Sequence, residues 1–281
     1  MSPLPEISFV LAGSTPLASQ RASFMTHLNY IKCMERFVAS SSISGSIVGT
    51  PTLRIADIKR FRKLDIVTRK SIRKDIALAR EDAAFAVIAA PWFPVKCYYS
   101  LYYLESILIH LIDGTISGFG KGGHSAVRKK IYSLVATGKL SFGVPELSCV
   151  HVLANIQNFP SIAPGQNATN DFWCKAECLN SVAKKLMEYK LHDVRMGKRW
   201  NLHTKKHRIE QSAFISAEKL MLIDFFYWYR IKANYRDLDY IDFENGITEI
   251  EVRTYIEAYY NTYTMYRSQL LRKIGMLMPS V

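Results

Sequence analysis

The sequence contains little glycine, proline or cysteine for its length. Its 281 residues include 14 Gly, 10 Pro and 5 Cys, which excludes collagen-like and low-complexity chains. The odd number of widely spaced cysteines argues against a disulfide-framed secreted scaffold and fits reduced thiols in a cytoplasmic protein. Hydrophobic residues make up 49% of the chain, too many for wholesale disorder, so we expect a globular protein.

Long apolar runs are also missing. The closest approach to a membrane span, residues 98–112, contains Glu105 and His110 and is shorter than the roughly 18 residues that a span requires. Residues 1–13 have no basic segment ahead of their apolar stretch, which is not the pattern of a signal peptide. We therefore expect a protein with no membrane partner.

Acidic residues are in the minority. The 37 Lys and Arg outnumber the 24 Asp and Glu and give a formal net charge of +13. This excess favours a polyanionic partner, either a nucleic acid or an acidic surface, although charge alone names no chemistry.

Strand signals are scarce, whereas apolar residues recur every three or four positions along most of the chain. This spacing predicts an all-α protein. The expected helices cover residues 21–39, 54–90, 95–112, 124–137, 171–195, 212–235 and 248–275. A Ser- and Gly-rich stretch, residues 40–49, marks a linker. We therefore divide the chain into an N-terminal helix with its linker, residues 1–53, and a helical bundle, residues 54–275, with a basic insertion at about 141–211.

Two segments concentrate the positive charge. The first, residues 54–80, has ten basic residues against three acidic ones and apolar residues near helical spacing. The second, residues 184–208, interleaves nine Lys or Arg with a tryptophan and three histidines. Basic side chains neutralise phosphates and an aromatic ring stacks on a base, so RNA is the expected partner, with a solvated face as the alternative. The candidate RNA-binding residues are Arg60, Arg62, Lys63, Lys184, Lys185, Arg195, Lys198, Arg199, Trp200, Lys205, Lys206 and Arg208.

Three short motifs carry a resemblance to a known superfamily. They lie in the passages PWFPVKCYYSLYYLESILIHLIDG, GHSAVRKKIYSLVATGKL and LIDFFYWYRIKANYRDLDYID. The motif residues are the pair Tyr98 and Tyr99, the run Gly123, His124 and Ser125, and the block Arg230, Ala233 and Tyr235. In their order and spacing, the motifs resemble the HEPN superfamily of helical bundles over roughly residues 66–275.

The resemblance implies an up-and-down bundle of four or five helices that is usually a homodimer. Members are often metal-independent RNases of toxin–antitoxin or antiviral defence systems, and no cofactor is expected. Their shared motif is an arginine followed four to six residues later by a histidine. Arg230 matches the arginine, but none of residues 231–237 is a histidine. On this resemblance, Arg230 would stabilise transition-state charge, and Asn234 and Tyr235 would position the ribose or the scissile phosphate.

A structural role for the same residues is the alternative. The free pKa of tyrosine is about 10, so Tyr235 is better suited to donate a proton than to act as a base. Arg230 would then pair with Asp237 or Asp239, and the Tyr235 ring would lie in the core. Perturbed residues of this kind need not be catalytic.

A zinc site is a weaker alternative. Cys174 and Cys178, and His203 and His207, form two i,i+4 pairs of metal-ligand types, but the spacing between the pairs is about twice that of a common zinc finger. Buried thiols and a solvated loop explain them equally well. His203 or His207 is also a candidate for the absent family histidine. His124 begins a helix, where we expect a capping or packing role.

The first hypothesis is therefore an RNA-binding HEPN-like protein, with metal-independent endoribonuclease activity as its candidate reaction. Its rival is a non-catalytic HEPN-like scaffold that binds a partner protein, such as an antitoxin, or a ribonucleoprotein complex. A structural homodimer with no nucleic-acid role is the third hypothesis.

Overall fold

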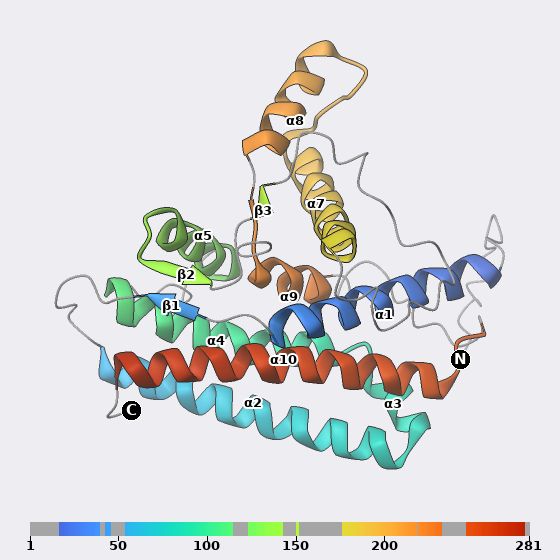
Figure 1. Cartoon of the computed structure of the whole chain (residues 1–281), viewed down its shortest axis with the longest axis vertical. Helices are drawn as coiled ribbons and strands as arrows, with labels where there is room; N and C mark the ends of the chain where they lie inside the picture. The colour runs from blue at the N-terminus through green and yellow to red at the C-terminus, as the bar shows by residue number, and fades with distance from the viewer. Residues whose placement is uncertain are drawn as a thin grey trace, which may run out of the picture.

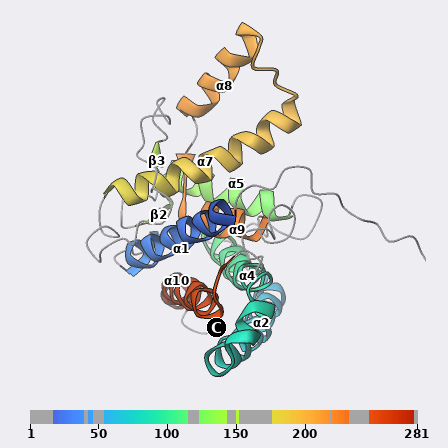
Figure 2. The ribbon, with the colours of Figure 1, turned by 90° about the vertical axis from the view of Figure 1, so that its right-hand side faces the viewer.

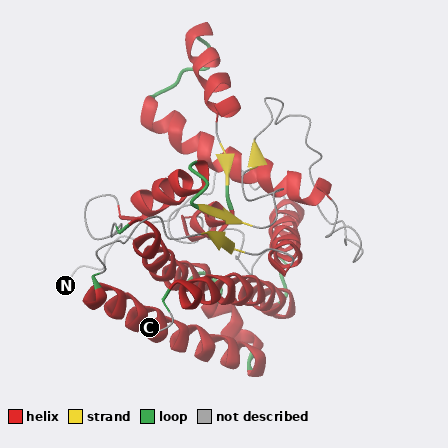
Figure 3. Ribbon diagram, turned by 60° about the vertical axis from the view of Figure 1, so that its left-hand side comes forward, coloured by secondary structure: helices red, strands yellow, loops and turns green. Residues whose placement is uncertain are grey.

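The structure is a computed structural model, and it describes residues 17–39, 43–45, 54–114, 123–142, 150–151, 176–217, 219–231 and 246–278. These residues are mostly helical, which confirms the all-α prediction (Figures 1 and 3). The helices are α1 (Leu17–Ala39), α2 (Ile55–Glu81), α3 (Ala83–Ala89), α4 (Phe93–Asp113), α5 (Gly123–Ala136), α7 (Ala176–Lys198), α8 (Lys205–Ala217), α9 (Leu222–Ile231) and α10 (Glu249–Leu277). Two short antiparallel pairs join β1 (Ile43–Gly45) to β2 (Leu140–Phe142) and β3 (Val150–His151) to β4 (Lys219–Leu220).

Several helices begin or end at residues that are typical helix caps. Thr248 and Glu251 form a capping box at the start of α10, with each side chain bonded to the other residue's backbone N–H. Asp82 leaves the helical conformation between α2 and α3, and its side chain accepts the Ala84 N–H at 2.9 Å. Gly114 ends α4 with φ of 71°, a left-handed conformation that glycine adopts without steric cost. The predicted helix over 54–90 is therefore two helices.

The core lies where α10 passes between α1 and α2 and against α4 (Figures 1 and 2). Tyrosine rings fill it from α10: Tyr255, Tyr259, Tyr263 and Tyr266 are all buried. The ring of Tyr266 stacks on Phe226 of α9 at 5.5 Å between centroids and 7° between planes. The tyrosine-rich face of α10 is thus a packing surface, because large rings stabilise a core through the apolar area that they bury.

The N-terminal helix belongs to this core. Phe24 and Ile31 of α1 are completely buried, and His27 Nδ1 lies 3.0 Å from the hydroxyl of Tyr229 on α9. Glu35 Oε1 accepts the side-chain N–H of Asn261 on α10 at 2.9 Å. Helix α1, which the sequence assigns to an N-terminal segment, therefore packs along α10.

A buried ion pair ties α2 and α10 together. The carboxylate of Asp65, which has no exposed surface, accepts two bonds from Arg267 at 3.1 and 2.6 Å. Ser100 of α4 donates to the same carboxylate at 2.7 Å, and its oxygen also lies 2.7 Å from the hydroxyl of Tyr263. Arg62 completes the network at 2.6 Å. Of the α2 residues that the sequence assigns to RNA, Arg62 is therefore engaged in holding the fold.

The predicted helix over 212–235 is interrupted. The chain leaves α8 at Ala217, forms β4 and starts α9 at Leu222. The side chain of Asp224 accepts the Met221 N–H at 2.8 Å, which satisfies an amide at the start of α9. Leu220 and Met221 are buried, so the break places apolar side chains against the core rather than in solvent.

No helix in the described ranges combines the length and the apolar character that crossing a membrane requires.

Candidate functional site

The candidate site lies where α4, α5 and α9 meet. Arg230, near the end of α9, is only 8% exposed. Its guanidinium carbon lies 5.2 Å from the ring centre of Tyr98 and 5.8 Å from those of Tyr99 and Tyr227. Its buried Nε has no hydrogen-bond partner among the described residues. Ring faces attract a cation, but they do not replace the hydrogen bonds that a buried guanidinium loses on leaving water.

His124, the second residue of α5, lies beside this guanidinium. Its ring centre is 5.3 Å from those of Tyr98 and Tyr99 and 4.6 Å from that of Tyr102. Burial and, secondly, the charge of Arg230 lower the pKa of His124 from 6.5 to about 4. The imidazole is therefore neutral at pH 7.

Tyr98 orients the imidazole. Its hydroxyl oxygen lies 3.2 Å from His124 Nδ1, a separation that permits a hydrogen bond in either direction. Burial raises the pKa of Tyr98 well above its usual value, so the phenol keeps its proton. When His124 donates from Nδ1, its Nε2 holds a free lone pair. A neutral imidazole of this kind can accept a proton from a bound group.

A second arginine completes the cluster from α5. Arg128 bonds Asp224 Oδ1 through Nε at 3.1 Å and through Nη2 at 2.5 Å. Burial alone would lower the pKa of Arg128, but Asp224 raises it above the ordinary value, so the guanidinium stays charged. Its carbon lies 4.0 Å from the ring centre of Tyr227, the ring that also contacts Arg230. We call Arg128, Arg230 and His124 the arginine–histidine cluster.

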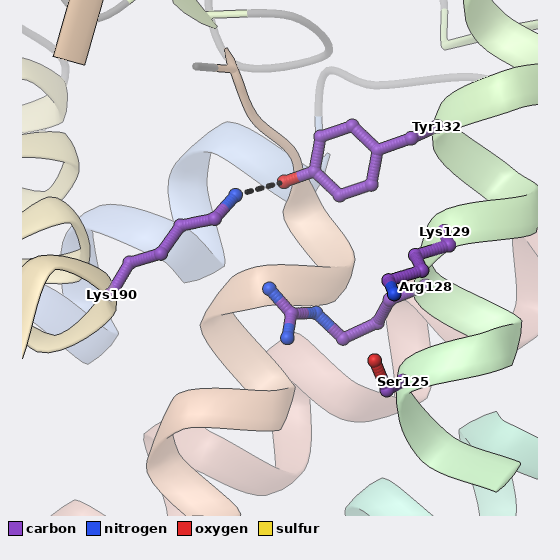
Figure 4. Close-up of a pocket in the computed structure, with 5 residues that line it drawn as sticks. All are labelled: Ser125, Arg128, Lys129, Tyr132 and Lys190. Carbon is purple, nitrogen blue, oxygen red and sulfur yellow. Dashed lines mark hydrogen bonds between the residues drawn. The ribbon is translucent and has the colours of Figure 1, made fainter. Parts of the chain in front are cut away.

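A pocket of about 360 Å³ opens between α5 and α7, beside the arginine–histidine cluster. It is lined by Ser125, Arg128, Lys129 and Tyr132 of α5 and by Lys190 of α7 (Figure 4). We call it the α5–α7 pocket. The four α5 residues share one helical face, because they are spaced three, four and seven positions apart. Lys190 donates to the Tyr132 hydroxyl at 3.2 Å across the pocket.

A buried acid lies on the core side of the site. Glu105 of α4 is 1% exposed, and its Oε1 accepts the Tyr266 hydroxyl at 3.2 Å. Its Oε2 has no partner among the described residues. Burial raises its pKa from 4.5 to about 8, and the neighbouring carboxylate of Asp224 adds to the rise. The side chain is therefore mostly protonated at pH 7.

The basic residues predicted for RNA binding fall on two separate surfaces. On α2, Arg60 and Lys63 are exposed. On α7 and α8, the exposed ones are Arg195, Lys198, Arg199, Lys205, Lys206 and Arg208, while Lys184 and Lys185 are half-buried. In Figures 1 and 2, α2 and α8 lie at opposite ends of the molecule, with α5 and α9 between them. The predicted residues therefore do not form one continuous surface.

The sequence predicts that Trp200 stacks on a base of RNA, but the structure places its ring in a buried position. It is 7% exposed, and its Nε1 donates to Glu210 at 2.8 Å. Its ring packs edge-on against Phe214 at 6.1 Å. Arg199 just before it has φ of 53°, so the chain turns sharply between α7 and α8. The ring thus fixes this turn, and stacking on RNA would require it to leave its place.

Several predicted residues lie outside the described part of the chain. They are Asn234, Tyr235, Asp237, Asp239, Cys174 and the side chain of Cys178. Within the described ranges, no three His, Cys, Asp or Glu side chains come together as metal ligands. His207, in the first turn of α8, accepts a hydrogen bond at Nδ1 from the backbone N–H of Asn201 at 2.8 Å. This imidazole therefore stabilises the turn that precedes α8.

Comparison with known proteins returned no match: no family model, no curated protein and no solved structure is similar to the chain. The HEPN resemblance therefore remains a prediction from three short motifs.

Sequence reasoning named Arg230 as a candidate but did not name most of the residues that surround it. His124 was expected to cap or pack, and it does pack on three tyrosines, yet it also faces Arg230 from a helix distant in the chain. Arg128 and Tyr132 were not singled out, although their polar face on α5 is visible as helical spacing. Asp224, the residue that holds Arg128, left no such signal because it lies far away in sequence.

Proposed function

We propose that this chain is an RNA-binding HEPN-like protein whose arginine–histidine cluster cleaves RNA without a metal. The observation that carries the proposal is Arg230, a buried guanidinium with an unpartnered Nε among the described residues, next to a neutral histidine. Structural arginines this deeply buried are normally paired with a carboxylate, so an anionic ligand is the natural partner.

The chemistry of RNA self-cleavage matches these groups. His124, neutral at pH 7, takes the proton of a ribose 2′-hydroxyl, and the 2′-oxygen attacks the adjacent phosphorus. Arg230 donates hydrogen bonds to the oxygens that gain charge in the phosphorane. The bond to the 5′-oxygen breaks and that oxygen takes a proton from water, while His124 releases the proton it accepted to solvent, which leaves a 2′,3′-cyclic phosphate and a 5′-hydroxyl. The histidine of the family motif would then come from α5 instead of from the segment after Arg230.

Exposed cations supply the affinity for RNA. Lys198, Lys205 and Lys206 at the α7–α8 turn, and Arg60 and Lys63 on α2, lie in solvent. Phosphate contacts of this kind carry most of the sequence-independent binding energy and weaken steeply with salt. We expect binding with a strong salt dependence and little base preference.

The test incubates the protein with total RNA in EDTA and maps the cut ends. We expect wild type to leave cyclic phosphates. Arg230→Ala should lower the rate by about 10²–10³-fold, and His124→Ala by about 10²–10⁴-fold. Arg272→Ala, which removes an exposed arginine of α10, serves as the matched control and should cut at the wild-type rate.

Equal activity of wild type and Arg230→Ala would exclude the mechanism. RNA that is bound in a salt-dependent way but never cut would favour the non-catalytic scaffold, which uses the same cations without the chemistry. Circular dichroism of each variant should match wild type, so that loss of activity is not loss of fold.

A further inference from the structure

The α5–α7 pocket shares Arg128 with the arginine–histidine cluster, but its other lining residues take no part in the cleavage chemistry above. Arg128, Lys129 and Lys190 reach it from two helices, and the hydroxyl of Ser125 adds a neutral donor (Figure 4). The hydroxyl of Tyr132 donates its proton to Asp224 and accepts from Lys190, so it holds these two residues at the pocket. Lys129 is exposed and has no carboxylate partner among the described residues.

The positive charge of the pocket lining favours a ligand with two negative charges. Asp224, which is fully buried, is bonded to both Arg128 and Tyr132 of the lining. The described lining itself carries three cations and no acid. A phosphodiester carries one negative charge, whereas a phosphate monoester carries about 1.5 to 2 at pH 7, so the monoester matches better.

The donors are placed to share one anion. Arg128 donates hydrogen bonds from Nε and Nη2 to Asp224, and these bonds fix the position of its guanidinium. Its remaining N–H groups can donate to a second acceptor. Lys190 bonds Tyr132 Oη and lies 4.8 Å from the centre of that ring, so its ammonium is held at the pocket rather than in bulk solvent. The volume of about 360 Å³ is at the lower end for small-ligand sites, large enough for a phosphate with part of its nucleoside.

We propose that the α5–α7 pocket binds the terminal phosphate monoester of an RNA strand and so fixes where the strand meets the arginine–histidine cluster. This inference rests on the proposed function and names its substrate as RNA with a phosphorylated end. Tyr227 links the two sites, because its ring centre lies 4.0 Å from the Arg128 guanidinium carbon and 5.8 Å from that of Arg230. Those two carbons are therefore at most about 10 Å apart, within reach of neighbouring phosphates of one strand.

The experiment measures binding by fluorescence anisotropy with 2′-O-methyl oligonucleotides, which lack the attacking hydroxyl and so cannot be cut. One sequence is compared as its 5′-phosphate, its 3′-phosphate and its unphosphorylated form. Charge-assisted hydrogen bonds predict that wild type binds one phosphorylated form about 10- to 100-fold more tightly than the unphosphorylated form. Binding without cleavage keeps this result separate from the fate of the nuclease proposal.

Three lysine variants locate the effect. Lys129→Gln and Lys190→Gln should each lower the preference for the phosphorylated end by about tenfold. Lys74→Gln removes an exposed lysine of α2 and is the matched control: it should weaken all three oligonucleotides alike and leave the preference intact. Lys129 is exposed and forms no ion pair among the described residues, so we expect Lys129→Gln to fold. That variant therefore tests the pocket even if Lys190→Gln unfolds.

Equal affinity of wild type for the three oligonucleotides would overturn the proposal, and so would a preference that survives in both pocket variants. Competition by a nucleoside 5′-monophosphate, with the parent nucleoside as control, distinguishes the source of the phosphate. If the nucleoside monophosphate binds the pocket but a phosphate on the oligonucleotide end does not change its affinity, the site binds a free nucleotide. That result would overturn the proposal that the pocket binds an RNA end.

Discussion

Glu105 makes the stability of this protein depend on pH in a predictable direction. The side chain is buried between α4 and α10, its Oε2 is unpartnered among the described residues, and burial raises its pKa from 4.5 to about 8. In the folded protein it keeps a proton over a range in which the unfolded chain releases one. The perturbation is Glu105→Gln, which keeps the shape of the side chain and removes the ionisation.

The size of the effect follows from proton linkage. A raised pKa contributes stability that is complete below about pH 4.5 and is lost as the pH rises through about 8. Each pH unit of that window is worth about 1.4 kcal/mol, so wild type should lose about 5 kcal/mol of unfolding free energy through Glu105. Glu105→Gln should lose none through this position, and its stability relative to wild type should rise by the same amount.

The assay is urea unfolding followed by circular dichroism at several pH values between 4.5 and 8. Other groups, including His124, titrate in both proteins and cancel in the difference. Glu81→Gln, an exposed carboxylate at the end of α2, is the control and should follow wild type at every pH. A difference between Glu105→Gln and wild type that stays constant with pH would refute the argument that burial keeps this carboxyl protonated.

Two further predictions concern the core and the cluster. Asp65→Asn should lower the unfolding free energy by about 3–5 kcal/mol, because it leaves the buried Arg267 without its counter-charge. Asp57→Asn, at an ion pair whose arginine is 66% exposed and whose aspartate is 21% exposed, should cost less than about 1 kcal/mol in the same urea titration. Similar losses in both variants would contradict the argument. For cleavage, kcat/KM should rise through about pH 4 and stay level above pH 6, because His124 acts as a base only when neutral. A rise centred near 6.5 would instead indicate an unperturbed histidine.

Helix positions were the most predictable part of the molecule. The apolar spacing placed α4, α5 and α10 to within a few residues. These signals are local, since a helix with one apolar face repeats it every turn. Where a cap or a tertiary contact decides the boundary, the spacing misled: Asp82 divides one expected helix, and Asp224 helps start α9 inside another.

The site was less predictable, because contacts across the chain create it. Arg230 was identified through a motif, but no sequence pattern brings His124 of α5 beside it. The interleaved aromatic of the second basic segment suggested a stacking ring, yet Trp200 is sequestered by Glu210 and Phe214, which follow it on the next helix. Glu105 appeared in the sequence only as a charge that interrupts an apolar run, whereas burial raises its pKa to about 8.

The buried guanidinium of Arg230, whose Nε has no partner among the described residues, also bears on any effort to engineer this protein. A cation held at 8% exposure without a described counter-ion burdens folding, so an apolar replacement such as Arg230→Met relieves that burden. On the proposed function, the same replacement would remove the group that binds the anionic ligand beside Tyr98, Tyr99 and Tyr227. On the proposed function, selection for thermostability alone would therefore erode RNA cleavage at this position, because stability and ligand binding place opposite demands on this side chain.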